Sequence, residues 1–363
     1  MWRTVGQESS TEMLSRSIGE GSIHHAYLFV GPEHVGKRTL AIDLACALNC
    51  ESEQRPCGEC RACLRIIDGK HAGIHVETLE DPAGPEDTDT DAEEGRRGRT
   101  IRLHQIHRLQ HTSSLPPFEG KTKVLLIENA DCMTSEAANC LLKTLEEPPP
   151  NVVWMLLAEN ENRLLETIVS RCQRIGVRPM PAPELQTYLV ETRGADPEQA
   201  ALVARVSQGR TGWAISALTD ESVLADRSAC IESIIQLIYM GYSPRFELAR
   251  ELDAQYRRDP RSVMQTLQVW TTWWRDLLVV KGGCAESVVN VDYVNDLNEQ
   301  AASLSLQQIR ESIGKLNEAR ENLDLNVIAR LVFDSLVYTI PRIAKAAGDG
   351  VPSGALQDKN VTQ

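Results

Sequence analysis

The sequence lacks the features that mark membrane, secreted or broadly DNA-binding proteins. No run of about eighteen consecutive apolar residues occurs, so no membrane-spanning helix is expected. The N-terminus has no basic stretch followed by an apolar one, so no secretory signal is expected either. Basic residues number 38 against 51 acidic ones, and the formal net charge of −13 argues against broad non-specific binding of nucleic acid. We expect a cytoplasmic protein whose DNA contacts need a local basic patch or a partner.

The remaining composition is that of an ordinary globular protein. Hydrophobic residues make up 42% of the chain and charged residues 25%. A length of 363 residues is large for a single hydrophobic core, so two or three domains are expected.

A phosphate-binding loop with one missing group occupies residues 31–39. These residues match the pattern G-x-x-x-x-G-K-[ST] except that Arg38 fills the hydroxyl position. Gly31 and Gly36 would let backbone N–H groups approach phosphate oxygens, and Lys37 would neutralise their charge. The missing hydroxyl is the group that holds Mg²⁺ in such loops. ATP or ADP could therefore bind here, whereas metal-assisted hydrolysis is impaired.

The context of the loop favours a real phosphate site over a glycine turn that holds no phosphate. Residues 25–30 form an apolar run that predicts a buried strand before the loop. Residues 39–48 carry apolar side chains at helical spacing after it. The local prediction is strand, loop and helix, with Thr39 as the last candidate nucleotide-binding residue.

Four of the ten cysteines follow this helix in a cluster. They are Cys50, Cys57, Cys60 and Cys63. Thiolates spaced by two residues can converge on one tetrahedral ion, and four sulfurs leave no open position for a substrate. The spacing predicts a structural Zn²⁺ knuckle over residues 50–63, the alternative being a reduced thiol cluster or a redox pair.

The acidic pair that hydrolytic enzymes of this architecture need is degraded. A second buried strand is predicted at 123–127, and Glu128 and Asn129 follow it. That strand usually ends in Asp-Glu, of which the first carboxylate acts on the Mg²⁺ shell and the second polarises the attacking water. Glu128 keeps a carboxylate one methylene longer, and Asn129 removes the base because an amide has no oxygen of useful basicity. We interpret Asp131 as a helix-start residue rather than a substitute.

Further segments indicate the organisation of the chain. A third apolar strand is predicted at 152–158 after a helix at 135–147, so helices and parallel strands alternate in an α/β domain over 1–178. Residues 80–99 combine many carboxylates with prolines and predict a disordered insertion. Helical patterns dominate after residue 178, and we predict a small domain at 179–222, a larger all-helical one at 223–345 and a flexible tail at 346–363.

Three tryptophans stand out in the last helical region. Trp270, Trp273 and Trp274 share a large apolar stripe at helical spacing, which predicts packing in a core or at a subunit interface.

Several stretches together resemble bacterial clamp-loader subunits, which are AAA+ proteins of DNA polymerase III. The block Leu-Leu-Lys-Thr-Leu-Glu-Glu-Pro-Pro at 141–149 and the Ser-Arg-Cys block at 170–172 are specific in combination. The resemblance is strong over 20–180 and loose beyond. It implies an AAA+ domain with a parallel sheet and P-loop, a helical lid at 179–222 and a collar at 223–345 that joins subunits. The matching stretches are the phosphate loop, the four cysteines, and residues 119–124, 137–149 and 170–173.

Two types of subunit within this family compete for the chain. Gamma/tau motor subunits keep the loop hydroxyl, the Asp-Glu pair and a lid arginine that contacts nucleotide. This chain has Arg38, the pair at 128–129 and Gly212 at those places, although Arg210 lies close to the last. These departures resemble delta-prime subunits, which do not normally hydrolyse ATP. The alternative is a motor subunit that uses Thr39 for Mg²⁺.

The resemblance implies a role in trans for Arg171 of the Ser-Arg-Cys block. In this family that arginine reaches the γ-phosphate bound by a neighbouring motor subunit and stabilises charge in the transition state. The implied function is that of a non-hydrolysing subunit in a heteropentamer with gamma/tau and delta, which loads the sliding clamp onto primed DNA. The chain would then have no ATPase activity of its own, yet belong to the DNA polymerase III holoenzyme, a DNA-directed DNA polymerase. A zinc-stabilised interaction module with a vestigial loop and no replication role is the competing class.

Overall fold

The computed structural model describes residues 2–79, 100–115, 119–325 and 327–343. The chain divides into two compact units. Unit 1 comprises Met1–Ser228 and Val288–Val294, and unit 2 comprises Ala229–Ser287 and Asn295–Gln363. The predicted acidic insertion at 80–99 and the tail at 346–363 lie outside the described residues.

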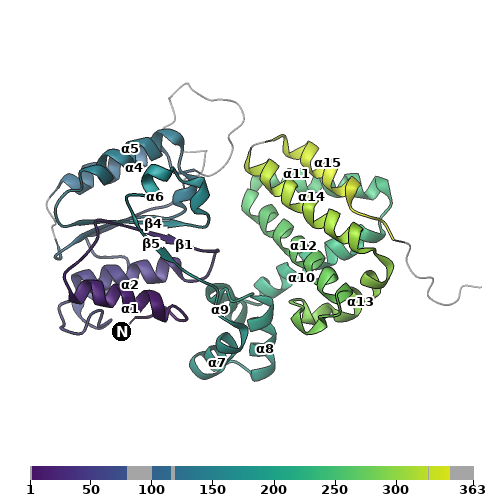
Figure 1. Ribbon diagram of the computed structural model, residues 1–363, viewed down its shortest axis with the longest axis horizontal. Helices are drawn as coiled ribbons and strands as arrows, with labels where there is room; N and C mark the ends of the chain where they lie inside the picture. The colour runs from purple at the N-terminus through teal and green to yellow at the C-terminus, as the bar shows by residue number, and fades with distance from the viewer. Residues whose placement is uncertain (1, 80–99, 116–118, 326, 344–363) are drawn as a thin grey trace, which may run out of the picture. The chain divides into compact units, whose positions relative to one another are not determined.

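A five-stranded parallel sheet forms the centre of unit 1 (Figure 1). The strand order is β2-β3-β4-β1-β5. The central strands were predicted because every residue of β3 and β4 is buried, which makes each a continuous apolar run. The two edge strands were not predicted. The bounds are β1 Ala26–Val30, β2 Ile74–Glu77, β3 Lys123–Ile127, β4 Val152–Ala158 and β5 Gln173–Gly176.

Helices cover both faces of this sheet (Figure 1). Each covering layer encloses its own cluster of buried apolar side chains against the strands. One layer holds α1 (Glu8–Gly19), α2 (Lys37–Asn49) and α3 (Arg61–Ile67). The other holds α4 (Leu103–Ser114), α5 (Ser135–Glu146) and α6 (Glu166–Val169).

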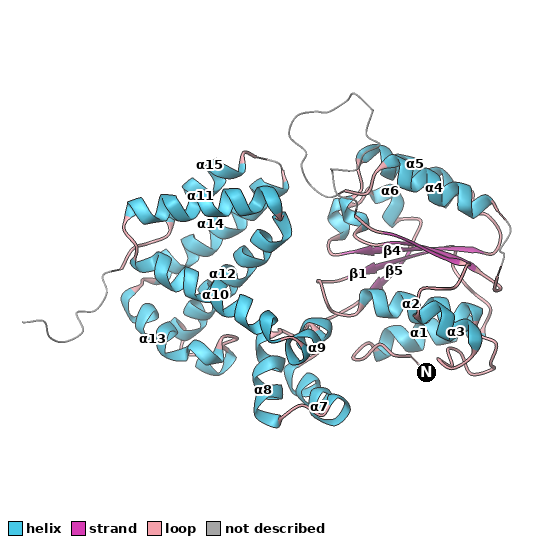
Figure 2. Cartoon of the chain, turned by 180° about the vertical axis from the view of Figure 1, so that it is seen from behind, coloured by secondary structure: helices cyan, strands magenta, loops and turns pink. Residues whose placement is uncertain are grey.

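Three further helices of unit 1 form a small bundle with a separate core (Figure 2). Its helices are α7 (Ala182–Arg193), α8 (Pro197–Val206) and α9 (Thr211–Thr219), all inside the range 179–222 for which helical patterns were predicted. Gly194 ends α7 in the left-handed conformation, and the Asp196 carboxylate caps α8.

The described part of unit 2 is helical, and its tryptophans form the core. Trp270, Trp273 and Trp274 are fully buried, as the apolar stripe predicted. The Trp270 Nε1–H donates to the Cys230 carbonyl and the Ser233 hydroxyl, each at 3.0 Å. The helices are α10 (Glu221–Tyr239), which begins in unit 1, then α11 (Tyr242–Arg258), α12 (Pro260–Lys281), α13 (Val294–Ser303), α14 (Leu306–Asp324) and α15 (Ala329–Thr339).

The predicted domain boundaries at 178/179 and 222/223 remain predictions, and the second falls inside α10. Among the described residues, no helix is both long and apolar enough to cross a membrane.

Candidate functional site

A pocket lies beyond the carboxyl ends of β1, β3 and β4. These ends meet at one edge of the sheet because the strands are parallel. The pocket has a volume of about 290 Å³. It brings together six residues predicted from the sequence, namely Gly36, Lys37, Arg38, Thr39, Glu128 and Asn129.

Two glycines shape the loop between β1 and α2. Gly36 adopts a φ of +99°, a left-handed conformation that a side chain would strain. Gly31 has no such angle, but a Cβ atom there would lie 2.1 Å from the Val177 carbonyl oxygen. The loop therefore needs Gly31 for close packing and Gly36 for its turn into the helix N-terminus.

The loop lysine is held by the loop itself. Lys37 Nζ donates to the carbonyl oxygens of Gly31 at 2.5 Å and Pro32 at 2.7 Å. Burial lowers the pKa of Lys37, while the carboxylates of Glu159, Asp131 and Glu33 oppose this shift. The ammonium is therefore already engaged by two carbonyl oxygens of its own loop and feels the charge of nearby acidic groups.

The two residues at the expected Mg²⁺-holding positions bind each other. Arg38 Nε donates to Glu128 Oε1 at 2.5 Å. Arg38 stands in the place of the loop hydroxyl, and Glu128 in the place of the first acid after β3. A guanidinium thus neutralises the carboxylate that would otherwise face a divalent cation. Thr39 lines the same pocket.

Besides Glu128, the carboxylate of Glu159 belongs to a residue that lines the pocket. Glu159 follows β4 directly, and its surface remains partly open to water within the pocket. Desolvation, the charge of Glu33 and a hydrogen bond with Glu33 raise the pKa of Glu159 to about 7, against the opposing effect of Lys37.

Asp131 takes a place that the sequence interpretation missed. Its Oδ2 accepts hydrogen bonds from the backbone N–H groups of Glu159 at 3.0 Å and Asn160 at 3.2 Å. The helix that follows, α5, is capped by Thr134 instead, whose hydroxyl accepts from the Ala137 N–H. Asp131 does lie at the start of a helix, in the first turn of the short 3-10 helix Ala130–Cys132, but it does not cap α5. Its role is to fix the end of β4, next to the charges around the loop lysine.

The small helical bundle contacts the phosphate loop through Gly212. The Gly212 N–H donates to the His34 carbonyl oxygen at 2.7 Å, and a Cβ on Gly212 would lie 3.0 Å from the same oxygen. Arg210 does not line the pocket. Its Nε donates to the Ser207 carbonyl at 2.9 Å, and its guanidinium lies 5.7 Å from the centre of the Trp213 ring.

The four clustered cysteines have the geometry of a metal site. Their sulfur atoms all lie within 4.8 Å of one another. The Cys50–Cys60 and Cys57–Cys63 sulfurs are 4.0 Å and 3.9 Å apart, close to the ~3.8 Å edge of a tetrahedron with Zn–S bonds of about 2.3 Å. Hydrogen bonds from the backbone N–H groups of Glu59 and Cys60 lower the pKa of Cys57 to about 6, which favours a thiolate ligand.

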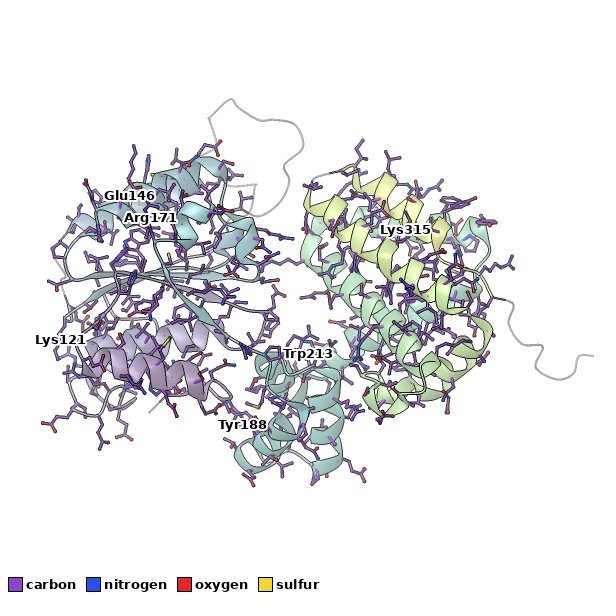
Figure 3. The ribbon with its side chains drawn as sticks, in the orientation of Figure 1. Lys121, Glu146, Arg171, Tyr188, Trp213 and Lys315 are labelled. Atoms are coloured by element: carbon purple, nitrogen blue, oxygen red, sulfur yellow. The ribbon has the colours of Figure 1, made fainter. Side chains whose placement is uncertain are left out.

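Arg171 lies away from the residues that line the pocket. It follows the short helix α6 and precedes β5, and its side chain is 35% exposed. The guanidinium donates to Glu146 Oε1 at 2.7 Å and to the Thr167 carbonyl at 3.0 Å. Figure 3 shows Arg171 and Glu146 together on the α5 and α6 side of the sheet.

Comparisons with known proteins agree with the resemblance. A family model described as DNA polymerase III, delta subunit, matches residues 6–181. The delta' subunit of Bacillus subtilis is 28% identical over 342 residues, which cover 93% of this chain and 98% of that protein. The chain belongs to the family of DNA polymerase III clamp-loader subunits. The delta' subunit of Pseudomonas aeruginosa is 33% identical, with 61% of this chain and 63% of that protein covered.

Other clamp-loader proteins match as well. The tau subunit of Bacillus subtilis is 24% identical over 99% of this chain, which spans 64% of that protein. Among solved structures, a gamma-subunit-related protein of Thermotoga maritima is 18% identical, covers 91% of this chain and 97% of its own, and has a TM-score of 0.45.

The sequence of this clamp-loader chain predicted some groups of the site and missed others. The loop, Glu128, Asn129 and the four cysteines were found by their spacing. Glu33, Glu159 and Glu146 were not. Glu159 carried a usable signal, because it follows the third predicted strand and carboxyl ends of parallel strands share an edge.

Proposed function

We propose that this chain is a non-hydrolysing subunit of the replicative clamp loader. It donates Arg171 to the ATP site of a neighbouring motor subunit and so helps to load the sliding clamp onto primed DNA. Membership of the clamp-loader family supports the role in replication. One contact carries the non-hydrolysing assignment, namely the 2.5 Å hydrogen bond between Arg38 and Glu128.

This contact bears on hydrolysis because it occupies both positions that normally hold the metal. Mg²⁺ bridges the β- and γ-phosphates and neutralises the charge that develops during hydrolysis. A carboxylate paired with a guanidinium of the same chain is a poor ligand for the metal shell. Asn129 also supplies no base for the attacking water. ATP or ADP remains a candidate ligand, held by loop N–H groups and Lys37 without the metal.

The position of Arg171 supports its proposed role in trans. The side chain is partly exposed and does not line the pocket of its own chain, so a phosphate bound by another subunit can approach it. An arginine presents several N–H donors in a planar fork that matches phosphate oxygens. We infer that the neighbour is a gamma/tau motor subunit within a heteropentamer that also contains delta.

The apolar surface of unit 2 supports its proposed role as the collar that joins subunits. Helix α15 buries one face through Phe333 and Val337, yet also exposes Leu331 and Tyr338, at 59% and 60%. Tyr338 stacks on Tyr242 of α11 with ring centres 5.6 Å apart. A helix that is apolar on two faces is typical of a subunit interface, because the outer face needs a partner to leave water.

We also propose that the cysteine knuckle holds a structural Zn²⁺. Cys50, Cys57, Cys60 and Cys63 would coordinate it through their sulfur atoms, whose spacing fits a closed tetrahedral site. Such a site contributes to folding and leaves no position for a reacting group.

Replacement of Arg171 by alanine tests the proposed function. ATP hydrolysis at the neighbouring motor subunit's site should fall about 10³-fold, in the range that a trans arginine contributes, and the ATPase rate of the complete loader should fall by the share of that site. Assembly, followed by size-exclusion chromatography, should not change. Arg174→Ala is the matched control because Arg174 is an exposed arginine of β5 paired with Glu161. An unchanged ATPase rate in the Arg171 variant would refute the role in trans.

One observation favours the motor-subunit alternative, because Thr39 lines the pocket and offers a hydroxyl. The ATPase activity of the isolated chain separates the two functions. A motor subunit would hydrolyse ATP with Mg²⁺ and lose that activity on Lys37→Ala. We expect no turnover from the isolated chain in either form.

A further inference from the structure

Arg171 is held by two contacts that come from different helices. Its guanidinium donates to Glu146 Oε1 at 2.7 Å and to the Thr167 carbonyl oxygen at 3.0 Å. Glu146 is the last residue of α5, and Thr167 lies in α6 (Figure 3). A guanidinium carries five N–H groups, so these two contacts leave donors for a phosphate.

Both acceptors are attached to rigid parts of the fold. Leu145, next to Glu146, is 2% exposed and packs in the core between the sheet and α5. Ile168, next to Thr167, is fully buried in the same core. The carboxylate and the carbonyl therefore have fixed positions. Their hydrogen bonds hold the long Arg171 side chain in one orientation at the surface.

Stability does not account for this ion pair. The side chains of Arg171 and Glu146 are 35% and 50% exposed. Exposed pairs of this kind contribute little to folding because water and salt screen them. The ion pair matters more for the geometry of Arg171. An unrestrained arginine side chain samples many rotamers, and fixing it in one rotamer when it binds a phosphate costs conformational entropy.

We propose that Glu146 is a positioning residue for Arg171, an inference that rests on the proposed role of this arginine in trans. The carboxylate holds one corner of the guanidinium and directs the remaining N–H groups outward to the γ-phosphate of a nucleoside triphosphate on the adjacent subunit. Glu147, the next residue, is exposed as well, but the contacts of Arg171 are with Glu146 and Thr167.

Three substitutions in the complete loader, assayed with clamp and primed DNA, test this proposal. Glu146→Ala should lower the kcat for ATP at the adjacent subunit's site about tenfold, the scale of loss expected when a catalytic group is misplaced, and the loader's total rate should fall accordingly. The KM for ATP should change less than about twofold, because the neighbouring loop binds the ground state. Glu146→Gln keeps an oxygen acceptor and should recover most of the lost rate. Glu147→Ala is the matched control and should behave as the wild type.

The outcomes separate this proposal from the one on which it rests. An unchanged or higher kcat in Glu146→Ala would overturn the positioning role, even with Arg171→Ala inactive. A Glu146→Gln variant as slow as the alanine variant would overturn it too, because the hydrogen bond would then not explain the effect. Full activity of Arg171→Ala would instead refute the proposed function itself. Size-exclusion chromatography of each variant loader checks that assembly is intact.

Discussion

The two ends of helix α2 differ in their relation to metal ions. At its N-terminus, Arg38 replaces a metal-holding hydroxyl and pairs with Glu128. At its C-terminus, Cys50 begins a cluster of four thiols with all sulfurs within 4.8 Å of one another. The helix thus joins four thiols that could hold a metal ion to a loop end where an arginine is paired with an acid.

The helix itself is suited to connect these two sites rigidly. Its ten residues from 40 to 49 are all buried between the sheet and the surrounding segments. Even its single acid, Asp43, is 1% exposed and accepts hydrogen bonds from the backbone N–H groups of Arg3 at 2.7 Å and Thr4 at 2.9 Å. The N-terminal end of the helix therefore keeps a buried, well-ordered scaffold, although Arg38 and Glu128 pair with each other there.

Of the substitutions at the two ends of α2, loss of one cluster thiol should have the largest effect on metal content and stability. Cys63→Ser removes a buried ligand, and we expect loss of stoichiometric zinc together with ~3 kcal/mol of stability. For a unit of this size, that loss lowers Tm by about 6–12 °C. Metal analysis and calorimetry measure both quantities.

Cys284→Ser is the control, since Cys284 is exposed and lies outside the cluster. Wild-type protein that contains far less than stoichiometric zinc would contradict the assignment of the knuckle.

Replacement of Arg38 should restore part of the capacity to hold a metal ion at the N-terminus of α2, and so make the two ends of this helix more alike. In Arg38→Thr, Glu128 loses its guanidinium partner and the loop regains a hydroxyl. We expect Mg²⁺ to increase the thermal stabilisation by ATP in this variant and not in the wild type. At a hundredfold excess of ligand over its Kd, binding adds about 2.7 kcal/mol. ATP turnover should stay absent because Asn129 provides no base.

Arg16→Thr on α1 is a matched control because Arg16 is an exposed arginine outside the pocket. An equal effect of Mg²⁺ on wild type and Arg38→Thr would contradict the account of the Arg38–Glu128 pair.

The smallest expected effect concerns Glu159. Its pKa is raised to about 7 from an ordinary value of 4.5, so the folded state binds its proton more tightly than the unfolded state. The ionised carboxylate therefore destabilises the fold above pH 7, and this penalty shrinks as the pH falls toward 4.5. Glu159→Gln should raise Tm by about 1–2 °C at pH 8 and by less at pH 5.5.

Glu12→Gln on α1 provides the comparison for this charge change, because Glu12 is exposed. Calorimetry that shows the same gain at both pH values, or a lower Tm at pH 8, would contradict the assigned direction of the pKa shift.

The sequence predicted the parts of the fold whose signal is local. The central strands were evident because burial on both faces makes them continuous apolar runs, as in β4. The edge strands β2 and β5 have four residues each and mix polar with apolar side chains, so no periodicity marks them.

The contacts that define the candidate sites could not be read from spacing. Arg38 and Glu128 were each recognised as departures from a motif, but they are 90 residues apart and their pairing depends on the order of the strands. The hydrogen bonds of Asp131 were missed for the same reason, since its N–H donors are at the end of β4, 28 and 29 residues further along the chain.

The ATPase rate of the complete loader, assembled with Lys37→Ala or with Arg171→Ala in this chain, tests the central claim most directly. The account predicts a rate within about twofold of wild type for the lysine variant, because this loop does not hydrolyse ATP, and for the arginine variant the loss of the share of the rate that comes from the site Arg171 serves. An equal and severe loss in the lysine variant would contradict the account, because this chain would then be one of the motors.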